Sequence, residues 1–306
     1  MWPVRRQTIV LMTHDIRGLF DAQGGVATTA QLLAVLSRSR LDTQIRTGQL
    51  LKVWPGVYSV DEPDTLIRLR GLDLRAGRPI AMCMGTAAAA YGFDSEDVVD
   101  LHVLNPAGHQ LCNSDGLFVH RRDGAPLIEI NGRLATSPEW TAVEVARGLR
   151  RSRALATLDA ALRSGTCDAR GLRAAADAQA GRRGIVVARE LIPLARAEAE
   201  SPMESEARLV MFDGGLPTPA LQYEIVDRSG RRWRLDFAWP DRRVAVEYDG
   251  FDWHSDPDTF RKDRQKRAAL QENGWSLVSI VSDDVRYRTG DMLRRIEVEL
   301  QRAHAA

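Results

Sequence analysis

Three acidic residues lie inside two apolar segments of the C-terminal third. Asp236 is part of LDFAW, and Glu247, eleven residues later, and Asp249 are part of VAVEYDG. Carboxylates in apolar segments cost desolvation free energy unless they are paired or bind a cation, so these positions favour a functional site. Hard divalent cations prefer oxygen ligands, and Mg²⁺ or Mn²⁺ bound here can polarise a phosphodiester and activate water. The alternative is that these carboxylates occupy edge positions of a sheet.

The elements around these residues bring them together. Residues 221–227, 231–239 and 242–250 are predicted strands joined by turns, preceded by a helix between Ser201-Pro202 and Gly214-Gly215. A hairpin through Pro240-Asp241 brings Asp236 and Glu247 to the same end of the sheet, and Glu247 and Asp249 share a face because they are two residues apart. A basic helix at 256–274, a strand at 275–281 and a closing helix complete an α/β domain with a mixed sheet.

Basic residues form two predicted patches near the carboxylates. One lies on the basic helix, with Arg261 and Lys262, and the other on the strand turn, with Arg231, Arg232 and Arg234. Such patches position nucleic acid through its phosphates without reading its sequence. Lys262 or Lys266 could also stabilise charge in a transition state, but a solvated helix face is the favoured interpretation.

The N-terminal residues predict a second nucleic-acid contact. Three short helical segments and a hairpin across Pro55-Gly56 follow one another between His14 and Val60, which is the order of a winged helix-turn-helix. The third segment and the hairpin offer donors for phosphates and base edges, namely Arg38, Arg40, Thr43, Gln44, Arg46 and Lys52. The alternative is a small helical packing module with solvated polar positions.

The composition excludes several classes of protein. The 306 residues carry 42 Lys and Arg against 41 Asp and Glu, so any DNA affinity depends on local patches. The three cysteines include no CxxC pair, which argues against a disulfide framework and a zinc site. Since no segment has the length of a secretory core or a membrane span, a cytoplasmic protein is expected.

The C-terminal motifs resemble a known family. The segments SPMES, RRWRLDFAWPDRRVAVEYDG, WH and DRQKRAALQENGW are similar to the DUF559 family. That family resembles the very-short-patch repair endonucleases of the PD-(D/E)xK, or restriction-endonuclease-like, superfamily. The resemblance covers about Ser201 to Ala303 and implies a Mg²⁺-dependent enzyme that cuts DNA phosphodiester bonds. It assigns Glu204, Asp236 and Glu247 as metal ligands.

The chain departs from the superfamily pattern at one position. Asp249 stands where a lysine is expected two residues after Glu247. The very-short-patch enzymes also lack that lysine and use two histidines. His254, in Trp253-His254, matches the second histidine and is implied to orient or deprotonate water. Asp249 replaces the first histidine, which leaves the metal chemistry open.

The N-terminal part also resembles a family. GGVATTAQL, LLKVWPGVYSV and TAAAAYGF are similar to AbiEi-type antitoxins of toxin–antitoxin systems, whose winged helix binds the DNA of the operon. This resemblance covers roughly Asp15 to Ala161 and implies DNA and a cognate toxin as partners.

Three domains are therefore expected: a winged helix-turn-helix at 1–62, a mixed α/β and then helical connecting domain at 63–199, and an endonuclease-like domain at 200–306. The leading hypothesis is a metal-dependent DNA endonuclease of repair or phage defence. The alternatives are a non-catalytic antitoxin or repressor that binds operator DNA, and a protein-interaction scaffold.

Overall fold

The computed structural model describes residues 14–93, 99–108, 110–121, 124–250 and 257–305. The chain forms two compact units, one of residues 1–86 with 99–136 and the other of residues 87–98 with 137–306. Helices and several small sheets make it a mixed α/β protein, as expected. The boundaries at 62/63 and 199/200 stay a prediction.

Three short helices and a hairpin begin the first unit, in the predicted order. They are α1 (His14–Ala22), α2 (Thr29–Val35), α3 (Arg38–Arg46), β2 (Leu51–Trp54) and β3 (Val57–Ser59). The sequence missed β1 (Val26–Thr28), which pairs antiparallel with β3 and makes a three-stranded sheet. Thr28 caps α2 in a capping box with Gln31, and Ser37 caps α3.

Apolar spacing explains how these helices pack. Phe20, Leu32 and Leu41, one from each helix, are buried in a common core. Because Leu41 faces that core, the other side of α3 is exposed to solvent.

The rest of the first unit consists of one helix, the start of a second helix and two pairs of strands. The elements are α4 (Thr65–Ala76), the start of α5 (Met84–Tyr91), β4 (Leu101–Leu104), β5 (Leu117–His120), β6 (Leu127–Ile130) and β7 (Arg133–Thr136). Strands β4 and β5 are parallel, whereas β6 and β7 are antiparallel. Met82 forms a bridge to Val103 of β4 and another to Ala135 of β7, and so joins the two pairs.

Helices begin the second unit, as their apolar spacing predicts. They are α6 (Pro138–Ala146), α7 (Arg151–Arg163), α8 (Ala169–Ala178), α9 (Ile185–Leu191) and the short η1 (Ile192–Leu194). Leu155, Leu158 and Leu172 are fully buried among them. Asp159 of α7 is also fully buried, and it pairs with Arg208 at 2.6 Å.

A four-stranded sheet with helices on both faces completes the second unit. Its elements are α10 (Pro202–Asp213), β8 (Ala220–Val226), β9 (Arg232–Trp239), η2 (Pro240–Arg242), β10 (Val244–Tyr248), α11 (Pro257–Glu272), β11 (Ser276–Ile280), α12 (Ser282–Arg286) and α13 (Thr289–Ala305). The strand order is β11-β10-β9-β8. Because β10 and β11 are parallel and the other pairs antiparallel, the sheet is mixed, as predicted.

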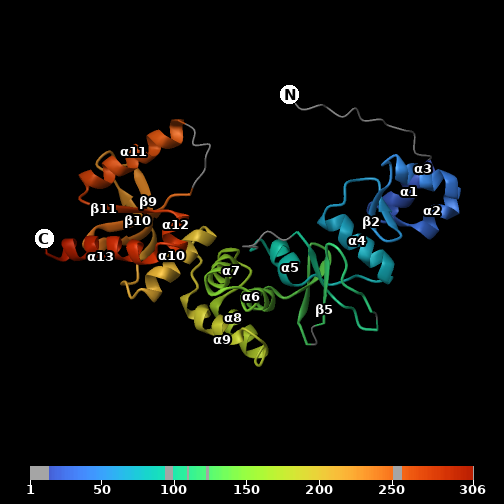
Figure 1. Ribbon diagram of the computed structural model, residues 1–306, viewed down its shortest axis with the longest axis horizontal. Helices are drawn as coiled ribbons and strands as arrows, with labels where there is room; N and C mark the ends of the chain where they lie inside the picture. Colours follow the sequence, from blue (N-terminus) through green and yellow to red (C-terminus); the bar gives the residue numbers. More distant parts are fainter. Residues whose placement is uncertain (1–13, 94–98, 109, 122–123, 251–256, 306) are drawn as a thin grey trace. The chain divides into compact units, whose positions relative to one another are not determined.

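The two faces of this sheet have separate cores. Ala207 of α10, Val285 of α12 and Ile296 of α13 pack on one face with Val246. Leu270 of α11 packs on the other with Ala245. Figure 1 shows α11 on one side of the sheet and α10, α12 and α13 on the other. Helix α11 is the crossover that a parallel β10–β11 pair requires. Among the described helices, none is long and apolar enough to cross a membrane.

Candidate functional site

Three carboxylates from three elements lie near one another in the second unit. Glu204 is in the first turn of α10, Asp236 is on β9, and Glu247 is on β10. Electrostatic repulsion by Asp236 contributes to raising the pKa of both Glu204 and Glu247. Asp236 therefore lies close enough to interact with both, which is the grouping that the sequence predicted.

Local sequence positions Glu204 and Asp236. Ser201 caps α10 by accepting a hydrogen bond from the Glu204 amide at 3.1 Å, with Pro202 in the first helical turn. The hairpin between β9 and β10 turns through η2, at the predicted Pro240-Asp241. Across that hairpin the Tyr248 amide donates to Asp236 Oδ2 at 3.0 Å.

Gln222 on β8 joins this group, and the sequence did not single it out. It lies opposite Asp236, between the pairs Leu221–Phe237 and Tyr223–Leu235. Its Nε2 donates to Glu204 Oε2 at 2.9 Å, and its amide group opposes the rise that burial causes in the pKa of Asp236. Its only signal in the sequence is a polar residue in an otherwise apolar part of the strand.

The backbone of Gln222 is in an unusual conformation. Its φ is +48°, in the left-handed region that non-glycine residues rarely adopt, and such strain is concentrated at functional sites. The buried Oε1 of its amide has no hydrogen-bond partner among the described residues. An amide oxygen without a hydrogen-bond partner, buried beside carboxylates, is the kind of ligand that hard cations prefer.

Lys266 of α11 contacts the Glu247 carboxylate. The interpretation of Lys266 as a solvated residue is therefore wrong, since its side chain is only 20% exposed and that of Glu247 14%. The physical reason is that α11 packs over the face of the sheet to which Glu247 points. Arg267 lies 3.8 Å from Asp249, so Glu247 and Asp249 share that face, as predicted.

Burial disfavours the charged form of the three carboxyls. Burial raises the pKa of Glu204, Asp236 and Glu247 above the ordinary values of these carboxyls. The Lys266 ammonium opposes this rise at Glu247, and the Tyr248 amide and Lys266 oppose it at Asp236. The fold thus holds three carboxylates where their charge is costly, which is typical of functional sites.

The donor set fits a hard cation in its chemistry, because carboxylate and amide oxygens are the ligands that Mg²⁺ prefers. Within the described residues, no three His, Cys, Asp or Glu side chains form a group that could hold a metal ion. His254 lies outside the described residues, as does the side chain of Lys262. The Mg²⁺ or Mn²⁺ site therefore stays a prediction.

The three arginines predicted to bind DNA on β9 and directly before it all have partners within the unit. Arg231 lies over the Trp233 ring, 4.0 Å from its centre, and donates to Gln265 at 2.7 Å. Arg232 pairs with Glu224 at 3.3 Å, and Arg234 with Glu200 at 2.6 Å. These three side chains and Arg261 are exposed, so they remain accessible to phosphates.

The predicted DNA-contacting face of α3 is solvent-exposed for most of its residues. Arg38, Arg40, Thr43 and Arg46 are exposed, as is Lys52 on β2. Gln44 differs because it is half-buried, and its Oε1 is buried without a hydrogen-bond partner in the described part of the chain. In this conformation its carbonyl oxygen does not face solvent.

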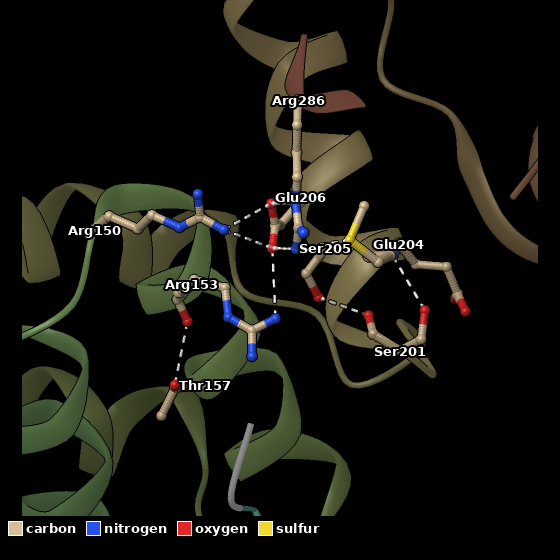
Figure 2. Close-up of polar contacts among 9 residues, drawn as sticks. Arg150, Arg153, Thr157, Ser201, Glu204, Ser205, Glu206 and Arg286 are labelled. Carbon is tan, nitrogen blue, oxygen red and sulfur yellow. Dashed lines mark hydrogen bonds and ion pairs between the residues drawn. The ribbon is translucent and has the colours of Figure 1, made fainter. Parts of the chain in front are cut away.

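Glu206 is the centre of an arginine cluster that the sequence did not reveal (Figure 2). It is 2% exposed and accepts hydrogen bonds from Arg150 at 3.4 Å, Arg153 at 3.4 Å and Arg286 at 3.0 Å. Since Glu204 is two residues away on α10, about 200° around the helix, its carboxylate is turned away from these arginines in Figure 2. Helix α10 therefore holds Glu204 on one side and binds α7 and α12 on the other.

Comparison with known proteins gives a partial assignment. Residues 80–194 match the family model of the AbiEi antitoxin C-terminal domain. The chain is similar to uncharacterized proteins of two Mycobacterium tuberculosis strains, CDC 1551 and H37Rv. Each is 54% identical over 271 residues, which is 89% of this chain and 100% of the relative. The AbiEi resemblance is confirmed for residues 80–194, whereas the resemblance to DUF559 and very-short-patch endonucleases stays a prediction.

Proposed function

This chain belongs to the same family as the two mycobacterial proteins, and because it carries an AbiEi antitoxin C-terminal domain, we propose that it is a DNA-binding, antitoxin-type regulator. The match over residues 80–194 is the observation that carries the proposal, because it assigns a toxin–antitoxin context to the middle of the chain. The antitoxin alternative is therefore better supported than the nuclease hypothesis.

Helix α3 is the proposed DNA-reading element, in a winged helix-turn-helix with the β2–β3 hairpin as its wing. Arg38, Arg40 and Arg46 offer exposed guanidinium groups, which suit bidentate contacts to guanine and to phosphates. Lys52 on β2 supplies a wing contact to the backbone. Since the net charge is only +1, this local face must provide the attraction, and binding should weaken steeply with salt.

A cognate toxin is the second proposed partner. Its test is co-expression in bacteria with the product of any gene that shares the operon. The proposal expects that growth arrest caused by the neighbouring protein is relieved by this chain. If no adjacent product is toxic and no product alters the DNA binding of this chain, the antitoxin assignment is wrong and only a repressor remains.

Metal-dependent DNA hydrolysis is a second candidate, and the buried group of Glu204, Asp236 and Glu247 with Lys266 favours it. Glu204, Asp236 and Glu247 would hold Mg²⁺, which when bound polarises a phosphodiester and activates water. Lys266 opposes the rise that burial causes in the pKa of Glu247, and it supplies positive charge beside the carboxylates. Asp249 would support the site, and His254 is expected to orient or deprotonate water.

Cleavage is tested with supercoiled plasmid and single-stranded DNA, incubated with Mg²⁺, Mn²⁺ or EDTA. The double variant Asp236→Ala/Glu247→Ala is the control. Metal-dependent nicking that this variant loses supports the enzyme. If DNA is bound but not cut in either metal, the group is not a nuclease site.

A further inference from the structure

The side chains around the C-terminal end of α12 carry more positive than negative charge. Arg150, Arg153 and Arg286 share Glu206, while Arg288 and Arg295 share Asp284 at 3.3 and 2.9 Å. Asp283, next to Asp284 on α12, is a third carboxylate and is exposed. The five arginines thus outnumber these three carboxylates. Both shared carboxylates are buried, so the surplus positive charge lies at the surface.

The buried carboxylate preorganises these arginines. A carboxylate has roughly four acceptor positions and each guanidinium has about five donors, so Glu206 cannot engage all the N–H groups of three arginines. Arg286 uses Nε and Nη2 on Glu206 at 3.3 and 3.0 Å, while Arg150 offers Nη2 alone. The Arg150 side chain is 59% exposed and that of Arg288 56%. Side chains already held in place lose less entropy when they bind a ligand.

Tyr287 adds an aromatic residue that stands between two of these arginines in the sequence. It follows Arg286 directly, precedes Arg288, and is 81% exposed. Basic residues at a helix C-terminus are expected, because they stabilise the last carbonyl groups. That effect does not explain an exposed tyrosine, nor Arg150, which comes from the start of α7. Guanidinium groups beside an exposed aromatic ring are the combination that binds single-stranded nucleic acid, through phosphates and base stacking.

We propose that Arg150, Arg286, Tyr287 and Arg288 form a nucleic-acid-binding surface, the α12 surface, which contacts phosphates and stacks a base on Tyr287. The inference rests on the proposed function because it takes DNA as the ligand. It goes beyond that function because it places a DNA contact on the second unit, and this contact does not depend on α3. The α12 surface is expected to bind without sequence preference, because phosphates and stacked bases give little sequence information.

The test measures fluorescence anisotropy of labelled DNA with the full chain, at several salt concentrations. The probes are a random-sequence single strand and a random-sequence duplex. The variants are Tyr287→Ser, Arg150→Gln and Arg288→Gln, and Arg286 is left intact because it supports Glu206. Arg294→Gln is the matched control, since Arg294 on α13 is 66% exposed and pairs with Asp291. Thermal melting verifies that each variant is folded.

The proposal expects Tyr287→Ser to weaken single-strand binding about tenfold, the effect of losing one stacked base. Each arginine variant should lower the salt slope by about 0.7 on the single strand and about 0.9 on the duplex. Arg294→Gln should bind like the parent chain. Three folded variants that bind both probes as the control does would overturn the inference.

Failure of this inference can be separated from failure of the proposed function. Arg38→Gln/Arg40→Gln is titrated in parallel on DNA from upstream of the gene. If that variant loses specific binding while the α12 variants lose nothing, the α12 surface is wrong and the regulator proposal stands. If the parent chain binds no DNA at low salt, both are wrong.

Discussion

Lys266 on α11 contacts the Glu247 carboxylate on β10, and this pair joins the basic helix to the acidic group. Position 249, where the endonuclease pattern expects a lysine, holds Asp249. The structure nevertheless places an ammonium group beside Glu247, and this ammonium belongs to the helix that crosses the same face of the sheet. The chain thus has an ammonium group beside Glu247 in space, although it has no lysine two residues after Glu247 in the sequence.

The Lys266–Glu247 pair should be energetically coupled. Lys266→Met leaves a largely buried carboxylate without its cation, and we expect a loss of about 1–3 kcal/mol in the free energy of unfolding. Lys266→Met/Glu247→Gln should recover most of that loss, because the unpaired charge is gone. Urea denaturation of the two single variants and the double variant measures the coupling. Additive effects would show that the contact does not stabilise the fold.

Asp236→Asn should stabilise the protein at neutral pH. Burial raises the pKa of Asp236 above 3.8, so the folded state favours the protonated carboxyl, and its contribution to stability is lost as the pH rises above that value. Asparagine removes this cost and still accepts from the Tyr248 amide. We expect a melting temperature about 2–4 °C higher at pH 7, the shift that roughly 1 kcal/mol produces.

The pH dependence of this effect provides its control. The difference between Asp236→Asn and the parent chain should begin to shrink as the pH falls through the raised pKa of the folded state, and it should vanish only below 3.8, where the unfolded carboxyl is protonated as well. Thermal melts from pH 4 to 8 measure it. A gain that is the same at every pH would contradict the electrostatic cause.

Divalent cations should stabilise the parent chain selectively if the acidic group binds them. Millimolar Mg²⁺ or Mn²⁺ should raise its melting temperature, because a ligand that binds only the folded state stabilises it. The Asp236→Ala/Glu247→Ala variant should show no such shift, and EDTA should reverse it. Equal shifts in both chains would indicate nonspecific cation binding elsewhere.

Glu206→Gln should be far more destabilising than Arg150→Gln. Replacing Glu206 removes the buried charge that three arginines share. Breaking a buried ion pair typically lowers the free energy of unfolding by about 3–5 kcal/mol. Arg150 is 59% exposed and leaves Arg153 and Arg286 on Glu206, so its loss should cost less than about 1 kcal/mol. Urea denaturation measures both, and equal costs would contradict the central role of Glu206.

Periodic patterns made much of this fold predictable. The helix between Ser201 and Gly214 and the strands around Asp236 and Glu247 follow from caps, turns and apolar runs. A short strand such as β1 has too few residues to show the alternation of apolar and polar residues that identifies a strand. The two-residue spacing of Glu247 and Asp249 correctly predicted that they share a face.

Partners that meet through the tertiary fold could not be read from the sequence. Gln222 joins the carboxylates because β8 pairs with β9, and Lys266 because α11 crosses the sheet. Glu206 binds arginines that lie 56, 53 and 80 residues away. Apart from the polar Gln222 in an apolar part of its strand, these residues have no local signal that distinguishes them from solvated ones, since their roles depend on which elements pack together.

The most direct test of the central claim is the binding of the full chain to duplex DNA from upstream of its own gene. Fluorescence anisotropy compares this DNA with a random duplex of equal length, and the parent chain with Arg38→Gln/Arg40→Gln. We predict tighter binding to the upstream DNA, by at least about 10³-fold, and loss of this preference in the variant. Equal affinity for both duplexes, or a preference that the variant retains, would contradict the account.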